Sequence, residues 1–443
     1  MKICFLGIGG VSMAKLAAYL KSLGFYVYGQ DRTESDATRA LKKLGINIFI
    51  GENFVGVKNA DIVVFSSAIS ESSYELTAAK SLKIPVIKRA ELLAMILRRF
   101  KNSIGVAGSH GKTTVTKMIA TVLRVAKINF FEHIGAFEGE FNSHFIKTPE
   151  FAVSEVCEYK KNIAYVTVKT AVVLNADNDH LDSYGNVSEL KKEFYKYLDR
   201  AQIKIINADD VNLKEYASRF NGGNKTPCLY SYGIVNIADY TVNNLSESEG
   251  EYSFDVYKSG AAFLKIKLRV LGLHNVYNAL AAIAALDLNG VSAQDIKFGI
   301  ESYAGAVRRF EKLGEIGKTT IIADYAHHPT EIKATLKTMK ELYGEDYVVI
   351  FQPHTYSRTK ILFDDFISAL CGEELVIYKT YAARESYDEA GDGARLAKEL
   401  FASYVKTPAE IFEYINTGNK KAALIMGAGD IYDEVKKMLK QDC

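Results

Sequence analysis

The sequence predicts an α/β protein built from three domains. Apolar strand-like runs alternate with helical patterns along most of the chain, which is typical of parallel sheets covered by helices. A length of 443 residues exceeds what one hydrophobic core usually serves. Three blocks follow one another: α/β alternation from residue 1 to about 100, a second block that changes to antiparallel-looking strands from residue 228, and renewed alternation from about residue 313. We therefore expect an N-terminal Rossmann-like domain over 1–100, a central α/β domain over 101–312 and a C-terminal Rossmann-like domain over 313–443.

The first block alternates short strands with helices from its first residues. We expect a strand over 2–6, a helix over 11–23 and a second strand over 25–29. Further strands are predicted at 46–50, 62–66 and 84–87, with a helix near 74–82.

A glycine turn joins the first strand to the first helix. Gly7 and Gly9 fit the GxGxxG fingerprint of dinucleotide sites, and Asp31 stands where a ribose-binding acid belongs. Ser12, however, replaces the third glycine, which normally permits close packing of helix and strand. Because a helix N-terminus after a glycine turn binds any diphosphate, these residues fit NAD, UDP or a turn without a ligand.

The central block opens on a glycine-rich segment, Ala107-Gly108-Ser109-His110-Gly111-Lys112-Thr113-Thr114. It follows the apolar run 103–106 and precedes a helical pattern over 115–125, as phosphate-binding loops do. In such loops the lysine reaches the β- and γ-phosphates and the first threonine holds Mg²⁺. The strict spacing requires a glycine at position 106, which is Val106, while Gly105 lies one residue early. The segment predicts ATP binding.

The remaining elements follow from the same periodicities. In the central block we expect strands at 151–156, 171–175 and 203–207, antiparallel strands at 228–232, 240–243, 252–257 and 263–270, and helices at 276–288 and 293–303. In the third block we expect strands at 319–323, 347–351, 375–378 and 422–426, and helices at 330–342, 363–371 and 396–404.

Two side chains at predicted strand ends are candidate magnesium ligands. Glu155 ends the apolar strand 151–154, and His180 follows the strand 171–174. The carboxyl ends of strands are where α/β proteins form ligand sites. Because Mg²⁺ keeps several waters, Thr113, Glu155 and His180 would be enough to hold it. The acidic residues around His180 are equally compatible with a solvated loop that caps a helix.

Composition and charge exclude several classes of protein. A net charge of +2 provides no electrostatic attraction for nucleic acid or an anionic membrane. No apolar run approaches the length of a membrane span. Five scattered cysteines without CxxC spacing argue against a zinc site or a disulfide framework. We expect a cytoplasmic enzyme with no nucleic-acid or membrane partner.

The segments in their order resemble the Mur ligases, over nearly the whole chain. The matching stretches are Gly7-Ile8-Gly9-Gly10, Ser66-Ser67-Ala68-Ile69, Arg89-Ala90-Glu91, residues 108–114, Glu155-Val156-Cys157-Glu158, Asp179-His180-Leu181-Asp182, His274-Asn275-Val276-Tyr277-Asn278-Ala279, Arg308-Arg309-Phe310, residues 324–330 and Phe351-Gln352-Pro353-His354.

The resemblance implies an ATP- and Mg²⁺-dependent enzyme that joins L-alanine to UDP-N-acetylmuramate, as a monomer or homodimer. It implies a UDP-binding N-terminal domain, a central ATPase domain and a C-terminal domain that closes over both. The implied UDP-site residues are Gly7, Gly9, Gly10, Asp31, Ser66 and Ser67. The implied ATP-site residues are Gly108, Ser109, His110, Gly111, Lys112, Thr113, Thr114, Asn275, Asn278, Arg308 and Asp324. The implied metal ligands are Thr113, Glu155 and His180. The implied catalytic residues are Lys112, His180, His327, His354 and Arg358. The implied amino-acid site comprises Tyr325, His354 and Arg358.

The sequence departs from the family pattern at Ser12, at Thr355 and in the stretch 159–163 after Glu158. These departures affect substrate contacts. The alternatives are a ligase that recycles whole peptides onto UDP-N-acetylmuramate, a folylpolyglutamate synthase, an inactive binding protein, or an NAD-dependent oxidoreductase in which Lys112 has no function.

Overall fold

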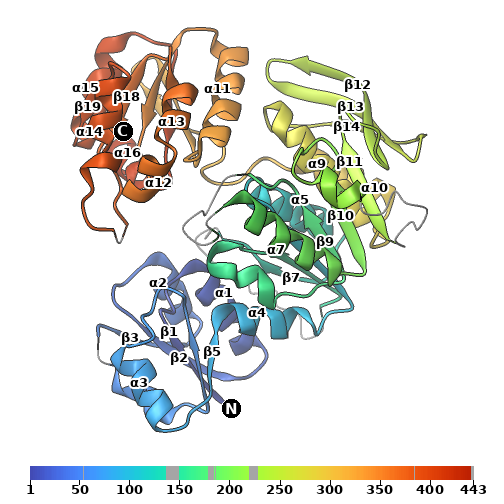
Figure 1. The fold of residues 1–443 in the computed structure, drawn as a ribbon, viewed down its shortest axis with the longest axis vertical. Helices are drawn as coiled ribbons and strands as arrows, with labels where there is room; N and C mark the ends of the chain where they lie inside the picture. The colour runs from blue at the N-terminus through green and yellow to red at the C-terminus, as the bar shows by residue number, and fades with distance from the viewer. Residues whose placement is uncertain are drawn as a thin grey trace. The chain divides into compact units, whose positions relative to one another are not determined.

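The computed structural model describes residues 1–52, 54–135, 149–177, 184, 186–218, 228–383 and 385–440 (Figure 1). It contains two compact units. The first comprises residues 1–244, 254–266 and 277–303, and the second comprises 245–253, 267–276 and 304–443. Each unit is described by itself. The predicted α/β class is confirmed, whereas the three domain boundaries stay a prediction.

The N-terminal part of the first unit is a five-stranded parallel sheet in the order β3-β2-β1-β4-β5. Its strands are β1 (Lys2–Leu6), β2 (Tyr26–Asp31), β3 (Asn47–Ile50), β4 (Ile62–Phe65) and β5 (Val86–Lys88). The connecting helices are α1 (Val11–Ser22), α2 (Asp36–Lys43), η1 (Val55–Asn59), α3 (Tyr74–Ser81) and α4 (Arg89–Leu97).

The strand order of this sheet determines where a ligand can bind. The chain leaves β1 toward β2 on one side and later returns to β4 on the other, so a crevice forms between the carboxyl ends of β1 and β4. The core on the two faces is made by alternating strand residues, with Ile3 and Phe5 on one side and Cys4 and Leu6 on the other. The turn after β1 therefore lies at a topological switch point.

The central part of the same unit contains a nine-stranded sheet in the order β14-β13-β12-β11-β10-β9-β6-β8-β7. The strands are β6 (Asn102–Ala107), β7 (Phe130–His133), β8 (Phe151–Glu155), β9 (Thr170–Val173), β10 (Ile203–Asn207), β11 (Leu229–Gly233), β12 (Tyr240–Ser248), β13 (Glu251–Lys258) and β14 (Ala261–Lys267). Its helices are α5 (Lys112–Val125), η2 (Tyr159–Tyr165), α7 (Val187–Asp199), α8 (Lys214–Ser218), α9 (Leu273–Asp287) and α10 (Ala293–Ser302).

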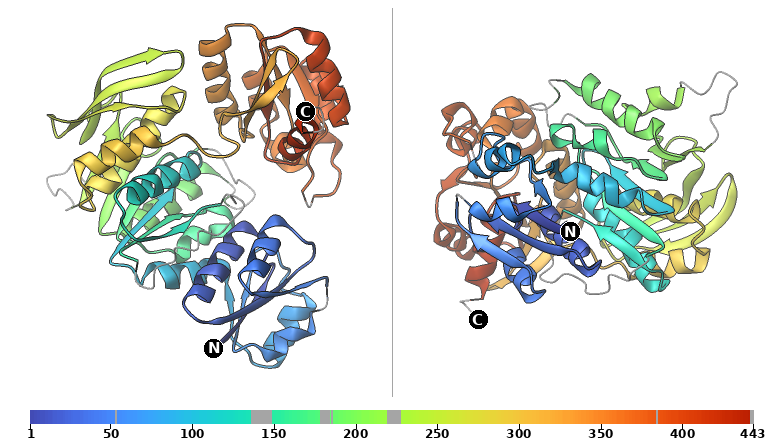
Figure 2. Two further views of the ribbon diagram at one scale, coloured as in Figure 1. Left: turned by 180° about the vertical axis from the view of Figure 1, so that it is seen from behind. Right: turned by 90° about the horizontal axis from the view of Figure 1, so that it is seen from below.

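One prediction about this sheet is wrong. The strand expected at 228–232 is not antiparallel, because β11 pairs in parallel with both β10 and β12. The connection from β10 to β11 includes α8. It is long enough to bring the chain back to the end of the sheet where β10 begins, which parallel pairing requires. The two-residue connections between β12, β13 and β14 do make hairpins, which Figure 2 shows in yellow-green.

The second unit carries a six-stranded sheet in the order β15-β16-β20-β17-β18-β19. Only the β15–β16 pair is antiparallel; the other pairs are parallel. The strands are β15 (Glu311–Ile316), β16 (Thr319–Asp324), β17 (Tyr347–Phe351), β18 (Leu375–Tyr378), β19 (Ser403–Val405) and β20 (Ala422–Met426). The helices are α11 (Pro329–Tyr343), α12 (Tyr356–Ile361), α13 (Phe363–Leu370), η3 (Glu389–Gly391), α14 (Gly393–Glu399), α15 (Pro408–Gly418) and α16 (Ile431–Leu439).

Local sequence signals explain several of these helix starts. Ser35 and Thr38 form a capping box at the start of α2, and Thr407 and Glu410 form another at the start of α15. Proline occupies the first position of α11, where its missing N–H group costs no helical hydrogen bond. No helix among the described residues is long and apolar enough to cross a membrane.

Tight packing beneath the phosphate loop yields a stability prediction. A Cβ at Gly105 in β6 would overlap Tyr197 Oη and lie 3.0 Å from Val156 Cγ2. Gly105→Ala should therefore lower the free energy of unfolding by roughly 1–3 kcal/mol, measured by urea denaturation. Tyr197 Oη is buried without a hydrogen-bond partner among the described residues. Tyr197→Phe should therefore restore most of the stability in the double variant. An unchanged midpoint in Gly105→Ala would contradict this packing.

Candidate ATP and substrate sites

The phosphate loop begins where β6 ends and closes on the N-terminus of α5. Gly108 has φ +138° and Gly111, the N-cap of α5, has φ +85°, a backbone region that favours glycine. A Cβ at Gly111 would lie 2.7 Å from Asn278 Oδ1, so the position is restricted by space as well. The loop thus presents its backbone to an anion at the start of a 14-residue helix.

The loop is held in place by the segment that follows β9. His110 N donates to Asn175 Oδ1 at 2.8 Å, and Asn175 Nδ2 donates back to His110 O at 3.1 Å. Ser109 Oγ accepts a hydrogen bond from Asp177 N at 2.9 Å, and His110 Nε2 lies 3.1 Å from Asp177 Oδ2. These bonds fix Ser109 and His110 before any ligand arrives.

Lys112 forms a buried ion pair at the start of α5. Its Nζ lies 3.0 Å from Glu158 Oε1, and the two side chains are 18% and 0% exposed. Nζ also donates to Ser109 O at 2.9 Å and to Gly108 O. The lysine therefore curls over its own loop, which is the place that a bound phosphate chain would take.

Glu155 ends β8 next to the loop, opposite Val106 of β6. Its Oε2 accepts a hydrogen bond from Gly135 N at 3.0 Å, whereas Oε1 is buried without a hydrogen-bond partner among the described residues. A buried carboxylate oxygen without a donor is costly. Thr113 lies in the first turn of α5. These oxygen donors fit the hard ligand set that Mg²⁺ prefers. The third expected ligand, His180, lies outside the described residues.

The N-terminal glycine turn lies at the switch point of its own sheet. Gly7 has φ +74°, and a Cβ there would be 3.4 Å from Ser66 Cβ at the end of β4. Gly9 N donates to Asp31 Oδ2 at 2.7 Å, while Asp31 Oδ1 accepts from Arg32 N at 2.8 Å. The carboxylate of Asp31 therefore supports the turn in this structure. Gly10 is the N-cap of α1.

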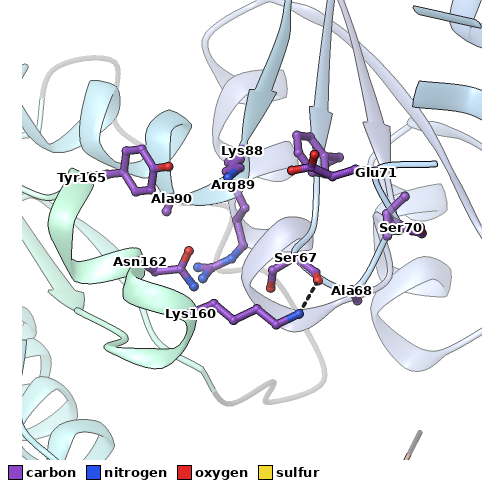
Figure 3. Close-up of a pocket in the computed structure, with 12 residues that line it drawn as sticks. Ser67, Ala68, Ser70, Glu71, Lys88, Arg89, Ala90, Lys160, Asn162 and Tyr165 are labelled. Carbon is purple, nitrogen blue, oxygen red and sulfur yellow. Dashed lines mark hydrogen bonds between the residues drawn. The ribbon is translucent and has the colours of Figure 1, made fainter. Parts of the chain in front are cut away.

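A cavity of about 380 Å³ opens between this N-terminal sheet and η2. Ser67 lines it, and Ser67 O accepts a hydrogen bond from Lys160 Nζ at 3.2 Å (Figure 3). Arg89 and Asn162 also line the cavity, and Figure 3 shows the Arg89 guanidinium directed toward Asn162. Lys160 belongs to the stretch 159–163 that departs from the family pattern. Residues of this altered stretch therefore form part of the wall of the cavity.

A second group of predicted residues comes together in the second unit, at the carboxyl ends of β16 and β17. The rings of His327 and His354 are 5.9 Å apart edge to face, and His354 stacks on Tyr381 at 5.4 Å. Arg358 Nη1 donates to His354 O at 2.9 Å and lies 3.3 Å from His354 Nδ1. Tyr325 packs edge-on against His327 at 5.2 Å.

Three of the remaining predicted ATP residues, Asp324, Arg308 and Asn275, have hydrogen-bond partners within the second unit. Both carboxylate oxygens of Asp324 accept backbone hydrogen bonds at 2.8 Å, from Phe310 N and Ala326 N, and burial raises the pKa of Asp324 to about 6. Arg308 Nη2 donates to Asp433 Oδ2 at 2.6 Å. Asn275 Nδ2 donates to Leu271 O at 2.7 Å in the first turn of α9. Their contacts with ATP stay predictions.

Sequence patterns assign no role in a site to several residues found around it. Glu158 belongs to a family motif only, and a lone histidine such as His133 is expected to be structural or on the surface. Burial, followed by the charges of Arg89 and Lys15, holds the pKa of His133 well below its ordinary value. Arg89 was likewise read as part of a motif without a role. Only the contacts between distant segments identify these residues.

Family models match three consecutive stretches of the chain. They are described as the Mur ligase family catalytic domain over residues 2–101, the Mur ligase middle domain over 106–286 and the Mur ligase glutamate ligase domain over 308–429. The chain belongs to the Mur ligase family.

The individual relatives narrow the comparison. The chain is 38% identical to UDP-N-acetylmuramate–L-alanine ligase of Caldicellulosiruptor saccharolyticus, with 97% of this chain and 96% of that protein covered. It is 37% identical to the ligase of the same name from Clostridium perfringens, over 99% of this chain and 98% of that one. The crystal structure of UDP-N-acetylmuramate–alanine ligase from Thermotoga maritima matches with a TM-score of 0.80 and 29% identity, covering 100% of this chain and 99% of that one. A murein peptide ligase from Psychrobacter arcticus, at 22% identity and a TM-score of 0.73, shares the fold.

The surroundings of His354 lead to a titration prediction. Burial, and then the charge of Arg358, lowers the pKa of His354 from 6.5 to about 4. In NMR of protein with isotope-labelled histidine, the His354 ring should be neutral at pH 7 and stay so as the pH falls through 6. Since the unfolded chain takes up this proton first, acidification from about pH 6.5 toward 4 should lower the free energy of unfolding.

Arg358→Gln removes the second cause only. The titration midpoint of the His354 ring should therefore rise in this variant but remain below 6.5. The spectrum of His354→Gln identifies which NMR signal belongs to His354. A wild-type midpoint near 6.5 would contradict the buried environment.

Proposed function

We propose that this protein is an ATP- and Mg²⁺-dependent ligase that joins L-alanine to the carboxylate of UDP-N-acetylmuramate in peptidoglycan precursor synthesis. The observation that supports it most is the pre-shaped phosphate loop beside Glu155, whose Oε1 is buried and without a donor among the described residues. The Mur ligase family membership and the names of the relatives over nearly the full chain agree with that chemistry.

Amide formation from a carboxylate requires a better leaving group than an oxide ion. In the proposed reaction a carboxylate oxygen of UDP-N-acetylmuramate attacks the γ-phosphorus of ATP, and the bond to ADP breaks. The alanine nitrogen then attacks the carbonyl carbon of this acyl phosphate. Inorganic phosphate leaves, the nitrogen loses its proton, and the amide remains.

The loop residues would stabilise the charge that spreads over the phosphoryl oxygens. The loop N–H groups and Lys112 donate hydrogen bonds that are positioned before the reaction, which is the effective form of electrostatic catalysis. Lys112 would exchange Glu158 for phosphate oxygens when ATP binds. Thr113, Glu155 and His180 would hold Mg²⁺, which supplies further positive charge at the same oxygens.

The histidine and arginine group in the second unit is the proposed site for the amino acid. Arg358 carries a planar fork of donors that can bind the alanine carboxylate through two parallel hydrogen bonds. His327, His354 and Tyr325 would surround the small side chain and the amino group. Ser66 and Ser67, with the glycine turn at Gly7, would bind the UDP part in the first unit.

Phosphate release with a panel of substrates tests the function. ADP and phosphate should form only when UDP-N-acetylmuramate and an amino acid are both present, and L-alanine should have the highest kcat/KM. Glycine and serine should react slowly, because one small group changes binding by only about 1–3 kcal/mol. ATP turnover without either co-substrate would contradict the ligase mechanism. Preference for L-Ala-γ-D-Glu-diaminopimelate would identify a peptide-recycling ligase.

Lys112→Ala should leave the fold intact and lower the turnover rate about 100-fold or more, as the loss of one preorganised charge contact does. Lys101→Ala is the matched control, because Lys101 is exposed and directly precedes β6. Circular dichroism checks the folding of both variants. Wild-type turnover in Lys112→Ala would exclude the phosphate-loop assignment.

Glu155→Gln should raise the Mg²⁺ concentration needed for half-maximal rate, since one anionic ligand is lost. Glu150→Gln is the matched control, an exposed acid just before the same strand. His180→Ala should act in the same direction as Glu155→Gln. If neither variant changes the Mg²⁺ dependence, the two residues have structural roles.

A further inference from the structure

Arg89 is a partly buried cation without an anionic partner in the part of the chain that the structure describes. Its Nη1 donates a hydrogen bond to Ser12 Oγ at 2.9 Å. Burial lowers the pKa of Arg89. Buried charges in proteins are normally paired, because an unpaired one loses its solvation without compensation.

The surroundings of Arg89 add positive potential. Arg89 is the first residue of α4, and its guanidinium lies beside Ser12 in the first turn of α1. Helix N-termini carry a partial positive charge and favour anions. The cavity beside Arg89 is also lined by Lys88 and Lys160, against the single acid Glu71. The positive potential of these groups favours the binding of an anion beside Arg89.

A chain of hydrogen bonds fixes the direction of the Ser12 hydroxyl. Ser154 Oγ lies 2.8 Å from Glu155 O, and because a carbonyl can only accept, the Ser154 hydroxyl must donate to it. His133 Nδ1, 3.0 Å from Ser154 Oγ, therefore carries the ring proton and donates. His133 is 3% exposed, and burial disfavours a charged ring, so Nε2 accepts from Ser12 Oγ at 2.6 Å. The lone pairs of Ser12 are then left for Arg89.

We propose that Arg89 binds the diphosphate of the sugar-nucleotide substrate, and that Ser12, His133 and Ser154 form a positioning chain that aims its guanidinium. The inference rests on the proposed function for the identity of the nucleotide. The diphosphate is the anion assigned here because Ser12 lies two residues after Gly10, the N-cap of α1, and the backbone N–H groups at such a helix start can bind a phosphate group.

The chain joins two parts of the first unit. Ser12 and Arg89 belong to the N-terminal sheet and its helices, whereas His133 and Ser154 lie on β7 and β8 of the central sheet. The last link is the backbone oxygen of Glu155, the proposed metal ligand. The side chains of Arg89, Ser12, His133 and Ser154 thus connect the proposed diphosphate site with β8, the strand that carries Glu155.

Calorimetry on the full-length protein with UDP, UDP-N-acetylglucosamine and UDP-N-acetylmuramate tests the role of Arg89. Arg89→Gln should lower the affinity for all three ligands roughly 10- to 100-fold, which is the usual effect of losing hydrogen bonds to a charged group. Arg98→Gln is the matched control, since Arg98 is exposed at the opposite end of α4. Unchanged affinities in Arg89→Gln would overturn the proposal. Weakening confined to UDP-N-acetylmuramate would also overturn it, because Arg89 would then bind the muramoyl carboxylate.

Ser12→Ala tests the positioning chain with almost no change of volume. This substitution should lower the affinity for UDP several-fold and leave the affinity for ATP unchanged. In the Arg89→Gln background it should cause no further loss of UDP affinity. His133→Gln should retain more UDP affinity than His133→Leu, because its amide oxygen can replace Nε2 as the acceptor. In NMR the His133 ring proton should reside on Nδ1. An Nε2–H tautomer, or additive losses in the double variant, would overturn the chain.

These measurements are separable from the test of the proposed function. UDP binding requires neither ATP nor amino acid, so loss of the ligase assignment would appear in phosphate release alone. If UDP and both sugar nucleotides fail to bind the wild-type protein while ATP binds, the Arg89 proposal fails independently.

Discussion

The position of β6 between β8 and β9 is the constraint on which the candidate ATP site depends. All three strands are parallel, so their carboxyl ends meet at one edge of the sheet. The loop after β6, Glu155 at the end of β8 and Asn175 after β9 consequently converge. The reciprocal hydrogen bonds between Asn175 and His110 then convert this convergence into a fixed loop. Glycine is needed at positions 108 and 111 because the chain after β9, at Leu174 and Asn175, lies against the loop.

The charged groups beside the candidate sites include two contrasting kinds. Asp31 and Asp324 have their carboxylates occupied by backbone N–H groups of nearby turns, so they stabilise the loops that contain them. Glu155 and Arg89 are different, because each keeps hydrogen-bonding capacity that the described residues do not use. The first kind stabilises the loops around a site, and the second kind has the capacity to bind a ligand. This distinction explains why similar residues at strand ends need different functional assignments.

The order of strands and helices was largely predictable, because apolar periodicity reports burial directly. The phosphate loop was also predictable, since a lysine after a glycine turn at a helix start has few other uses. The parallel pairing of β11 was not, because the direction of a strand depends on the path of its connection and leaves no mark in a five-residue run. Asp31 was expected at a ribose, and its bonds to Gly9 and Arg32 could be seen only in the folded chain.

The contacts of His133 show the same limit. Its partners Ser12 and Ser154 are 121 and 21 residues away in the sequence. A lone histidine in a short strand has no pattern that distinguishes a buried hydrogen-bonding role from a surface position. Arg89 is visible as a motif residue, but the absence of an anionic partner for it among the described residues is a property of three-dimensional packing. Long-range polar contacts are therefore the part of the site that sequence patterns leave undetermined.

The ion pair between Lys112 and Glu158 makes the phosphate loop self-neutralising. With the carboxylate fully buried at 0% exposure, the loop without nucleotide offers an incoming anion a lysine whose charge is already balanced. An anion that enters the loop must therefore displace Glu158 from Lys112, so the carboxylate is an internal competitor of every ligand that binds there.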